Sequence, residues 1–262
     1  MTAFLRFFRN SARSNLGRVL LALSLTLLAA PAPAGPPAAA TAQAFARWIP
    51  AGWRLLSSVT GDLDGDGRED AALVLEKTDA ARRQSNPGLG APELNLNPRR
   101  LLVLMQVGPG ERVLLRRDGL LPSENDAESP CLADPLDGGG VTMPPGRLVL
   151  ALQHWTSCGS YGAGQEQFIF RLEGARLRLI GHERSEFSRA SGEQTEVSTN
   201  LLTGQRKTVE GLNAFERSST ARTRWQRLGT LAPVFLDTLD RALLACEPPP
   251  AASPATPPVW CR

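Results

Sequence analysis

A cluster of acidic residues in the first third of the chain has the composition and spacing of a metal-binding loop. Asp62, Asp64 and Asp66 occupy alternate positions, Gly65 and Gly67 flank the last of them, and Asp70 follows. Calcium takes six to eight oxygen ligands, and carboxylates at alternate positions can surround it where glycine permits a sharp turn. These aspartates are therefore candidate side-chain ligands for calcium, and Arg68 would add its main-chain carbonyl.

The alternative for this loop is an acidic turn without a metal. The four aspartate carboxylates within nine residues repel one another unless a cation neutralises them, which favours bound calcium. The pattern is not an EF-hand, because Leu73 stands where that loop has its bidentate glutamate. Residues 70–76, DAALVLE, have the length and composition of a β-strand, so we expect the loop to join two strands.

The segment GDLDGDGREDAALVLE resembles the calcium loop of FG-GAP or VCBS-type repeats, found in integrin α-chain propellers and in secreted bacterial proteins. Their pattern is D-x-[DN]-x-D-G-x-x-D followed by a strand. The resemblance implies calcium binding by Asp62, Asp64, Asp66, Asp70 and the Arg68 carbonyl. It covers about one repeat, and the chain is too short for a full propeller of such blades. The wider layout, including FRLEGARLRLIGHE and STNLLTGQRK, is similar to exported bacterial proteins that carry one such loop, and this similarity implies no reaction.

Short apolar or alternating runs bounded by turn residues predict β-strands along most of the chain. The runs are 53–59, 70–76, 100–107, 111–117, 147–155, 166–173 and 175–183. Alternating apolar residues on both sides of Glu173 and Gly174 make the last two runs the clearest hairpin. The alternation of polar and β-favouring residues over 192–211 predicts solvent-facing antiparallel strands.

One stretch near the C-terminus is predicted to be helical. After Pro233, residues 234–246 place Phe235, Leu236, Leu239 and Leu243 on one helical face. Residues 247–262 form a proline-rich tail that cannot be helix or central strand. The expected fold is mainly β, with antiparallel sheets of propeller-blade-like hairpins over 48–246 and one short C-terminal helix.

The N-terminus has the pattern of a secretory signal. Arg6, Arg9, Arg13 and Arg18 precede an uncharged run at 19–30, and cleavage is expected after Ala34, with Ala42 and Ala44 as alternative sites. Residues 35–47 would form an alanine- and proline-rich leader. A retained membrane anchor is the other reading of the apolar run. The signal predicts a periplasmic or secreted protein of a Gram-negative bacterium, with no membrane span after cleavage.

The net charge of the mature chain is close to zero. The whole chain has 29 basic and 26 acidic residues, and residues 1–34 hold four of the arginines and no acid. The remaining 25 basic and 26 acidic residues give no electrostatic footprint for nucleic acid. The partner is expected to be a protein or a surface polymer.

The chain has four cysteines, all after the signal: Cys131, Cys158, Cys246 and Cys261. An even number in an oxidising compartment predicts two disulfides, for which three pairings are possible. We expect sequence neighbours to pair, Cys131 with Cys158 and Cys246 with Cys261. A zinc site is disfavoured, because CxxC spacing and histidine partners are missing.

The segment HWTSCGSYGAG, residues 154–164, is the best candidate for an enzyme site. It lacks the G-x-S-x-G spacing of a nucleophile elbow and the lysine of a phosphate-binding loop, so a disulfide-pinned glycine loop is the favoured reading. Trp155 and Tyr161 are candidates for an aromatic rim. His154 and His182 are expected to be hydrogen-bonded residues at strand edges.

The sequence therefore predicts an extracytoplasmic calcium-binding β-module with a structural or interaction role. The alternatives are a hydrolase using the loop near His154 and a cell-wall or surface-polymer binder.

Overall fold

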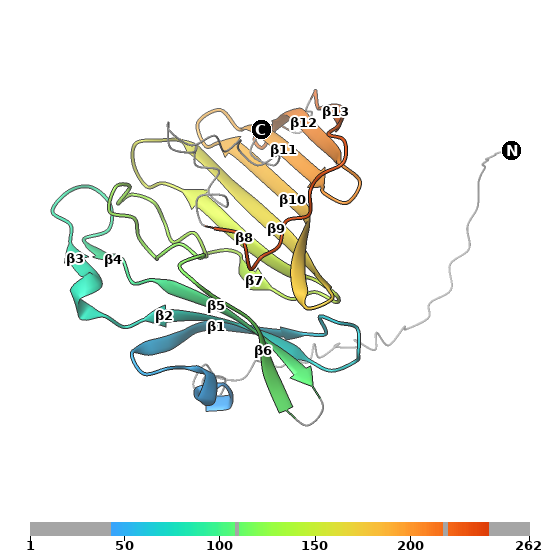
Figure 1. Cartoon of the computed structure of the whole chain (residues 1–262). Helices are drawn as coiled ribbons and strands as arrows, with labels where there is room; N and C mark the ends of the chain where they lie inside the picture. Colours follow the sequence, from blue (N-terminus) through green and yellow to red (C-terminus); the bar gives the residue numbers. More distant parts are fainter. Residues whose placement is uncertain (1–42, 108–109, 217–219, 241–262) are drawn as a thin grey trace, which may run out of the picture. The chain divides into compact units, whose positions relative to one another are not determined.

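The computed structural model describes residues 43–107, 110–216 and 220–240, and in this part of the chain antiparallel strands form two main sheets (Figure 1). The predicted mainly β fold with antiparallel sheets is confirmed. No helix in the described ranges is long and apolar enough to cross a membrane. The signal segment and most of the leader lie outside the described residues.

The small sheet has the strand order β1-β2-β5-β6. Its strands are β1 (Trp53–Gly61), β2 (Asp70–Lys77), β5 (Arg99–Val107) and β6 (Gly110–Asp118). Between β2 and β5 the chain forms a 3-10 turn, η2 (Ala80–Arg82), and a two-stranded ladder of β3 (Arg83–Ser85) and β4 (Glu93–Asn95). This ladder lies between the predicted strands at 70–76 and 100–107, in a segment where the sequence predicts no strand.

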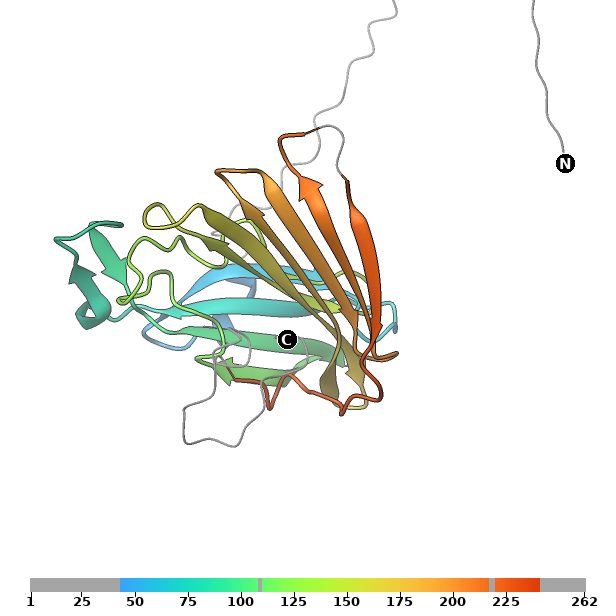
Figure 2. The same cartoon turned by 90° about the horizontal axis from the view of Figure 1, so that it is seen from above.

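The large sheet has the order β13-β12-β11-β10-β9-β8-β7, so each strand pairs with its neighbours in sequence. Its strands are β7 (Gly140–Thr142), β8 (Leu148–Trp155), β9 (Gly162–Glu173), β10 (Arg176–Ser188), β11 (Glu193–Asn200), β12 (Gln205–Asn213) and β13 (Arg222–Arg227). Figure 2 shows the strands of the large sheet lying across those of the small sheet. The predicted hairpin is the β9–β10 pair.

The main core lies between the two sheets. Alternate residues of a strand point to opposite faces, and one face of each sheet is apolar. Val74 and Val103 of the small sheet belong to the same buried cluster as Leu150, Phe168 and Phe170 of the large sheet. Full burial of such side chains contributes about 1.5–3 kcal/mol each, so this interface is the main source of stability.

A second, smaller core covers the other face of the small sheet. Leu73, Leu75 and Leu102 pack there with Trp48 and Trp53. Because β2 is buried on both faces, its sequence is a nearly continuous apolar run instead of an alternating one. The 3-10 turn η1 (Ala46–Trp48) is fixed to β6 through Glu111. This carboxylate accepts hydrogen bonds from Arg47 Nη2 at 2.6 Å and from Trp48 Nε1 at 2.7 Å.

The attachment of this turn is expected to depend on pH. Hydrogen bonds from Arg47 and Trp48 lower the pKa of Glu111. A carboxyl with a lowered folded-state pKa stabilises the fold above its unfolded pKa, about 4.3 for glutamate, and loses this contribution as the pH falls through the folded pKa. We expect Glu111→Gln to lower the free energy of unfolding by up to about 1 kcal/mol near neutral pH. The difference from the parent should shrink below about pH 4, measured by urea unfolding. If the two proteins differed in the free energy of unfolding by the same amount near neutral pH and below about pH 4, this role of Glu111 would be contradicted.

The described part of the predicted C-terminal helix is not helical. The carbonyl of Val234 accepts a hydrogen bond from the amide of Leu179 in β10, and the amide of Leu236 donates to the carbonyl of Leu177. Between them, Phe235 forms an isolated β-bridge with Arg178. The main-chain groups therefore bond to a neighbouring strand and not along a helix. Leu236 and Leu239 are fully buried in the main core, as side chains on an apolar face would be. Residues 241–262, which include the rest of the predicted helix and the tail, lie outside the described residues.

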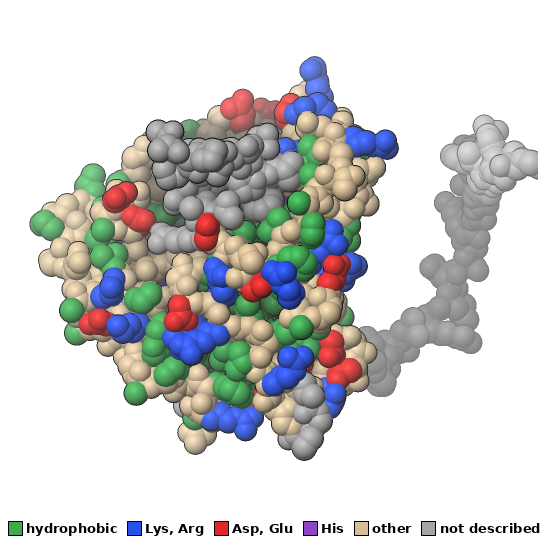
Figure 3. Space-filling view, in the orientation of Figure 1, with side chains coloured by type: hydrophobic (Ala, Val, Ile, Leu, Met, Phe, Trp, Pro, Cys, Tyr) green, Lys and Arg blue, Asp and Glu red, His purple; other side chains and the backbone are tan. Residues whose placement is uncertain are grey.

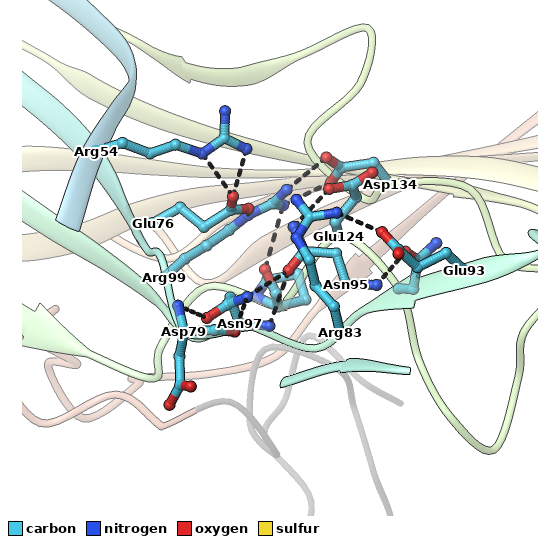
Figure 4. Close-up of polar contacts among 12 residues, drawn as sticks. Arg54, Glu76, Asp79, Arg83, Glu93, Asn95, Asn97, Arg99, Glu124 and Asp134 are labelled. Carbon is cyan, nitrogen blue, oxygen red and sulfur yellow. Dashed lines mark hydrogen bonds and ion pairs between the residues drawn. The ribbon is translucent and has the colours of Figure 1, made fainter. Parts of the chain in front are cut away.

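A charged network is buried where β2 ends and β5 begins (Figure 4). The side chain of Arg99 is 0% exposed and that of Glu76 is 1% exposed. Arg99 donates from both terminal nitrogens to Asp134, each at 2.6 Å, and its Nε lies 3.4 Å from Glu76. Arg54 of β1 also donates to Glu76 at 2.9 Å. The network thus joins the small sheet to the loop that precedes β7.

The loop before β7 is also held by a disulfide. Cys131 and Cys158 are bonded, with their Cα atoms 5.6 Å apart, which confirms the predicted pair. The bridge connects this loop to the turn between β8 and β9, and Leu132 forms a β-bridge with Thr156 beside it. Cys246 and Cys261, the second predicted pair, lie outside the described residues.

Candidate metal centre

The loop between β1 and β2 brings three of the four predicted aspartates together. One carboxylate oxygen each from Asp62, Asp64 and Asp70 lies within 4.8 Å of the other two. The β1–β2 ladder closes at Gly61 and Asp70, so the residues between them form one tight turn. Gly65 and Gly67 both have positive φ, 83° and 82°, a conformation that side chains disfavour. The glycines therefore permit the turn that gathers the carboxylates.

Main-chain amides orient the carboxylates of this loop. Asp62 accepts from the amides of Gly65 at 2.6 Å and Gly67 at 2.9 Å. Asp64 accepts from the amide of Asp66 at 3.1 Å. A carboxylate has about four acceptor sites, so each oxygen retains capacity for a cation. The loop is thus preorganised by its own backbone.

Asp70 is the buried member of the cluster, with 2% of its surface exposed. Its oxygens accept from the main-chain amides of Leu63 and Gln106, each at 2.9 Å, which ties the loop to β5. Burial raises the pKa of Asp70, although these two hydrogen bonds oppose the shift. The charges of Asp64 and Asp66 raise the pKa further. A bound cation would remove this penalty, because it stabilises the ionised carboxylate.

Asp66 does not join the cluster. Its carboxylate is paired with the side chain of Arg68, whose Nε donates at 2.9 Å, and it also accepts from the Arg68 main-chain amide. The side-chain hydrogen bond from Arg68 lowers the pKa of Asp66. Coordination by Asp66 would therefore require this ion pair to open. The sequence pattern places Asp66 among the ligands but contains no signal for this local pairing.

The spacing of the three clustered carboxylates fits calcium. Ca²⁺–O distances are about 2.3–2.6 Å, so two oxygens on one ion can be separated by at most about 5 Å. The separations within 4.8 Å satisfy that limit. Carboxylate and carbonyl oxygens are the ligands that Ca²⁺ and Mg²⁺ prefer, and the absence of nitrogen or sulfur from the cluster disfavours zinc. The residues present therefore fit a hard divalent cation.

Residues 62–70, which we call the metal loop because their carboxylates could hold an ion, also contact the connection between β7 and β8. The carbonyl of Asp62 accepts a hydrogen bond from the amide of Gly146 at 2.9 Å. A Cβ added at Gly61 would lie 2.3 Å from the carbonyl oxygen of Met143, so only glycine fits there. The loop of the small sheet therefore touches a turn of the large sheet. These two contacts are not predicted by the sequence pattern of the loop.

The segment near His154 forms the connection from β8 to β9. Its hydroxyl groups take part in the local turn: Thr156 donates to the carbonyl of Ser160, Ser157 donates to that of Cys131, and the Ser160 hydroxyl accepts from the amide of Gly162. His154 is exposed and lines a cavity of about 450 Å³ together with Glu166 and Arg184. The arrangement matches the favoured reading of a disulfide-pinned loop.

His182 differs from the sequence expectation of a hydrogen-bonded residue at a strand edge. It lies within β10, is 0% exposed, and neither ring nitrogen has a hydrogen-bond partner among the described residues. Its ring packs against Phe168 with centroids 4.9 Å apart. Its Nε2 is 4.0 Å from the nearest carboxylate oxygen of Glu166. The apolar environment of β9 and β10 explains the burial, because the residue faces the core side of the sheet.

Positive and negative side chains are intermixed on the face of the protein shown in Figure 3. Comparisons with protein-family models, curated proteins and solved structures give no match to this chain. Functional assignment therefore rests on the geometry of the loop and on the surfaces around it.

Proposed function

We propose that this chain is an extracytoplasmic calcium-binding β-module in which the ion stabilises the contact between the two sheets. The observation that carries the proposal is the convergence of Asp62, Asp64 and Asp70 in a loop that is bonded to both sheets. Calcium supplies positive charge to a site that otherwise holds three clustered carboxylates. Asp62 and Asp70 would hold the ion next to the main chain of Gly146 and Gln106, so binding would reinforce two connections at once.

The identity of the ion is proposed from ligand type and from the resemblance to FG-GAP or VCBS-type loops. Magnesium requires near-ideal octahedral geometry and retains several waters, whereas calcium accepts irregular oxygen cages of six to eight ligands. The further ligands proposed are the Arg68 carbonyl and, after the ion pair with Arg68 opens, Asp66. The export signal and the disulfide support a periplasmic or secreted location.

An NMR titration of the ¹⁵N-labelled protein with calcium tests the proposal. We expect saturable shifts of the amides between Gly61 and Asp70 and a dissociation constant of about 10⁻⁴–10⁻³ M, the range of extracellular modules. Asp64→Asn removes one clustered charge from an exposed position and should weaken binding at least tenfold. Magnesium should bind more weakly than calcium.

Glu69→Gln is the matched control, because Glu69 is an exposed acid of the same loop that does not belong to the cluster. It removes the same charge as Asp64→Asn and should change the affinity by less than threefold. The proposal is wrong if calcium produces no saturable shifts. Equal weakening by the two substitutions would show general charge attraction in place of a coordination site.

A further inference from the structure

The outward face of the large sheet presents hydrogen-bonding side chains in two straight rows. Residues that alternate with the core-facing Phe168 and His182 point to this face, and the strand register aligns them. The first row is Gln167, Glu183, Ser198, Lys207 and Trp225. The second row is Gln165, Ser185, Glu196, Val209 and Thr223. We call these the polar rows.

The polar rows run perpendicular to the strands and border a hollow. Neighbouring strands are about 4.8 Å apart, so a row across β9 to β13 is about 19 Å long. A surface cavity of about 440 Å³ is lined by members of both rows from β9 to β12. A site of this form fits an elongated ligand that crosses several strands.

Several of these side chains are already oriented. Gln167 donates to the side-chain oxygen of Gln165 at 3.1 Å, and Gln194 donates to Glu196 at 2.9 Å. Each glutamine amide can both donate and accept, and a carboxylate only accepts. Preoriented groups lose less side-chain entropy when a ligand binds, which favours affinity.

The chemistry of the rows fits hydroxyl groups. Amides, serine and threonine hydroxyls, carboxylates and an ammonium together require a ligand that donates and accepts at closely spaced points. Glu183, Glu196 and Lys207 carry charges of both signs, which disfavours a polyanion such as nucleic acid. Val209 is the only aliphatic residue in the two rows. The surface is therefore too polar for a mainly apolar ligand.

Trp225 completes the first row at the edge strand. Trp225 is 65% exposed, and the strand register places it in line with the polar side chains of the first row. The flat indole face packs well on the C–H face of a sugar ring, and its apolar area would otherwise remain in water. We propose that the polar rows bind an extended neutral polysaccharide, with one sugar ring against Trp225 and the hydroxyl groups of the next units bonded along the rows.

Affinity electrophoresis of the full mature chain tests this proposal. Native gels would contain soluble β-1,4-glucan, β-1,3-glucan, α-glucan or galactomannan, each compared with a gel without polymer. We expect at least one polymer to retard the protein. Trp225→Ala and Gln167→Ala should each weaken the apparent affinity about tenfold or more in that gel. Both positions face outward, and unchanged melting temperatures would show that the variants remain folded.

Tyr161→Ala is the control, because Tyr161 is similarly exposed at 69% but does not belong to the polar rows. It should leave the retardation unchanged. Asp64→Asn should also leave it unchanged, since the metal loop belongs to the small sheet, so this proposal stands or falls separately from calcium binding. Migration unaffected by all four polymers would overturn the proposal. Retardation that persists in both row variants would overturn it too.

Discussion

Calcium is expected to raise the melting temperature of the disulfide-intact protein by about 5–10 °C over its value in chelator. A ligand at about 100 times its dissociation constant adds about 2.7 kcal/mol to the free energy of unfolding. For a domain of this size, 1 kcal/mol corresponds to roughly 2–4 °C. The physical cause is the cluster of Asp62, Asp64 and Asp70, whose mutual repulsion the ion removes. Differential scanning calorimetry at a fixed protein concentration measures the shift.

Asp64→Asn should abolish most of the calcium-dependent shift and Glu69→Gln should retain it. In chelator, Asp64→Asn should melt no lower than the parent, because it relieves repulsion and its single main-chain hydrogen bond can still be accepted by the amide oxygen. If Asp64→Asn lowered the melting temperature relative to the parent by as much in chelator as in calcium, Asp64 would stabilise the turn itself and would not act through the ion.

Asp134→Asn is expected to destabilise the protein by about 3–5 kcal/mol, the largest effect of a single substitution proposed here. The substitution keeps the shape of the side chain but removes the charge that pairs with the fully buried Arg99. Burial by itself would lower the pKa of Arg99, and Asp134 and Glu76 oppose this by stabilising the charged form. Without Asp134, a buried guanidinium is left with incomplete compensation. Urea unfolding at neutral pH, with the disulfide intact, measures the change.

Glu93→Gln provides the matched control for this buried pair. Glu93 also pairs with an arginine, Arg83, at 2.6 Å, but both side chains are about half exposed. Exposed pairs contribute about 0–1 kcal/mol, so this variant should unfold close to the parent. The double variant Arg99→Met with Asp134→Leu should recover part of the lost stability, because it removes the buried guanidinium together with its partner while Glu76 keeps its hydrogen bond from Arg54. Comparable losses for Asp134→Asn and Glu93→Gln would refute the role assigned to burial.

The strands could be predicted because their apolar patterns are local. The run at 70–76 and the hairpin of 166–183 match β2, β9 and β10, with boundaries that differ by a few residues. The solvent-facing alternation of 192–211 corresponds to β11 and β12. Strand β13 was not predicted, because RTRWQR is exposed along its whole length and has no apolar face. An edge strand whose side chains are exposed on both faces leaves little pattern in the sequence.

The clustering of aspartates in this loop was predicted from their spacing and from the resemblance to FG-GAP or VCBS-type loops, but the surroundings of the loop were not. Alternate aspartates and glycines identify the turn, whereas the pairing of Asp66 with Arg68 depends on side-chain conformations. The contacts of Asp70 with Gln106 and of Asp62 with Gly146 join positions that are distant in sequence. The apolar spacing of 234–246 predicts a helix, yet at Val234 and Leu236 β10 offers main-chain partners that a local pattern cannot reveal. Tertiary contacts therefore determine what local patterns leave undecided.

The sequential order of strands in both sheets has a consequence for how the chain acquires its structure. Nearly every ladder joins strands that are neighbours along the chain, so each hairpin closes a short loop. Short closures cost little chain entropy and favour rapid folding. A polypeptide that emerges N-terminus first can therefore complete the small sheet before the large sheet is available. The contact between the metal loop and the β7–β8 turn can then form once the first hairpin of the large sheet has emerged, so the finished small sheet would serve as a template on which β9 to β13 are added one by one.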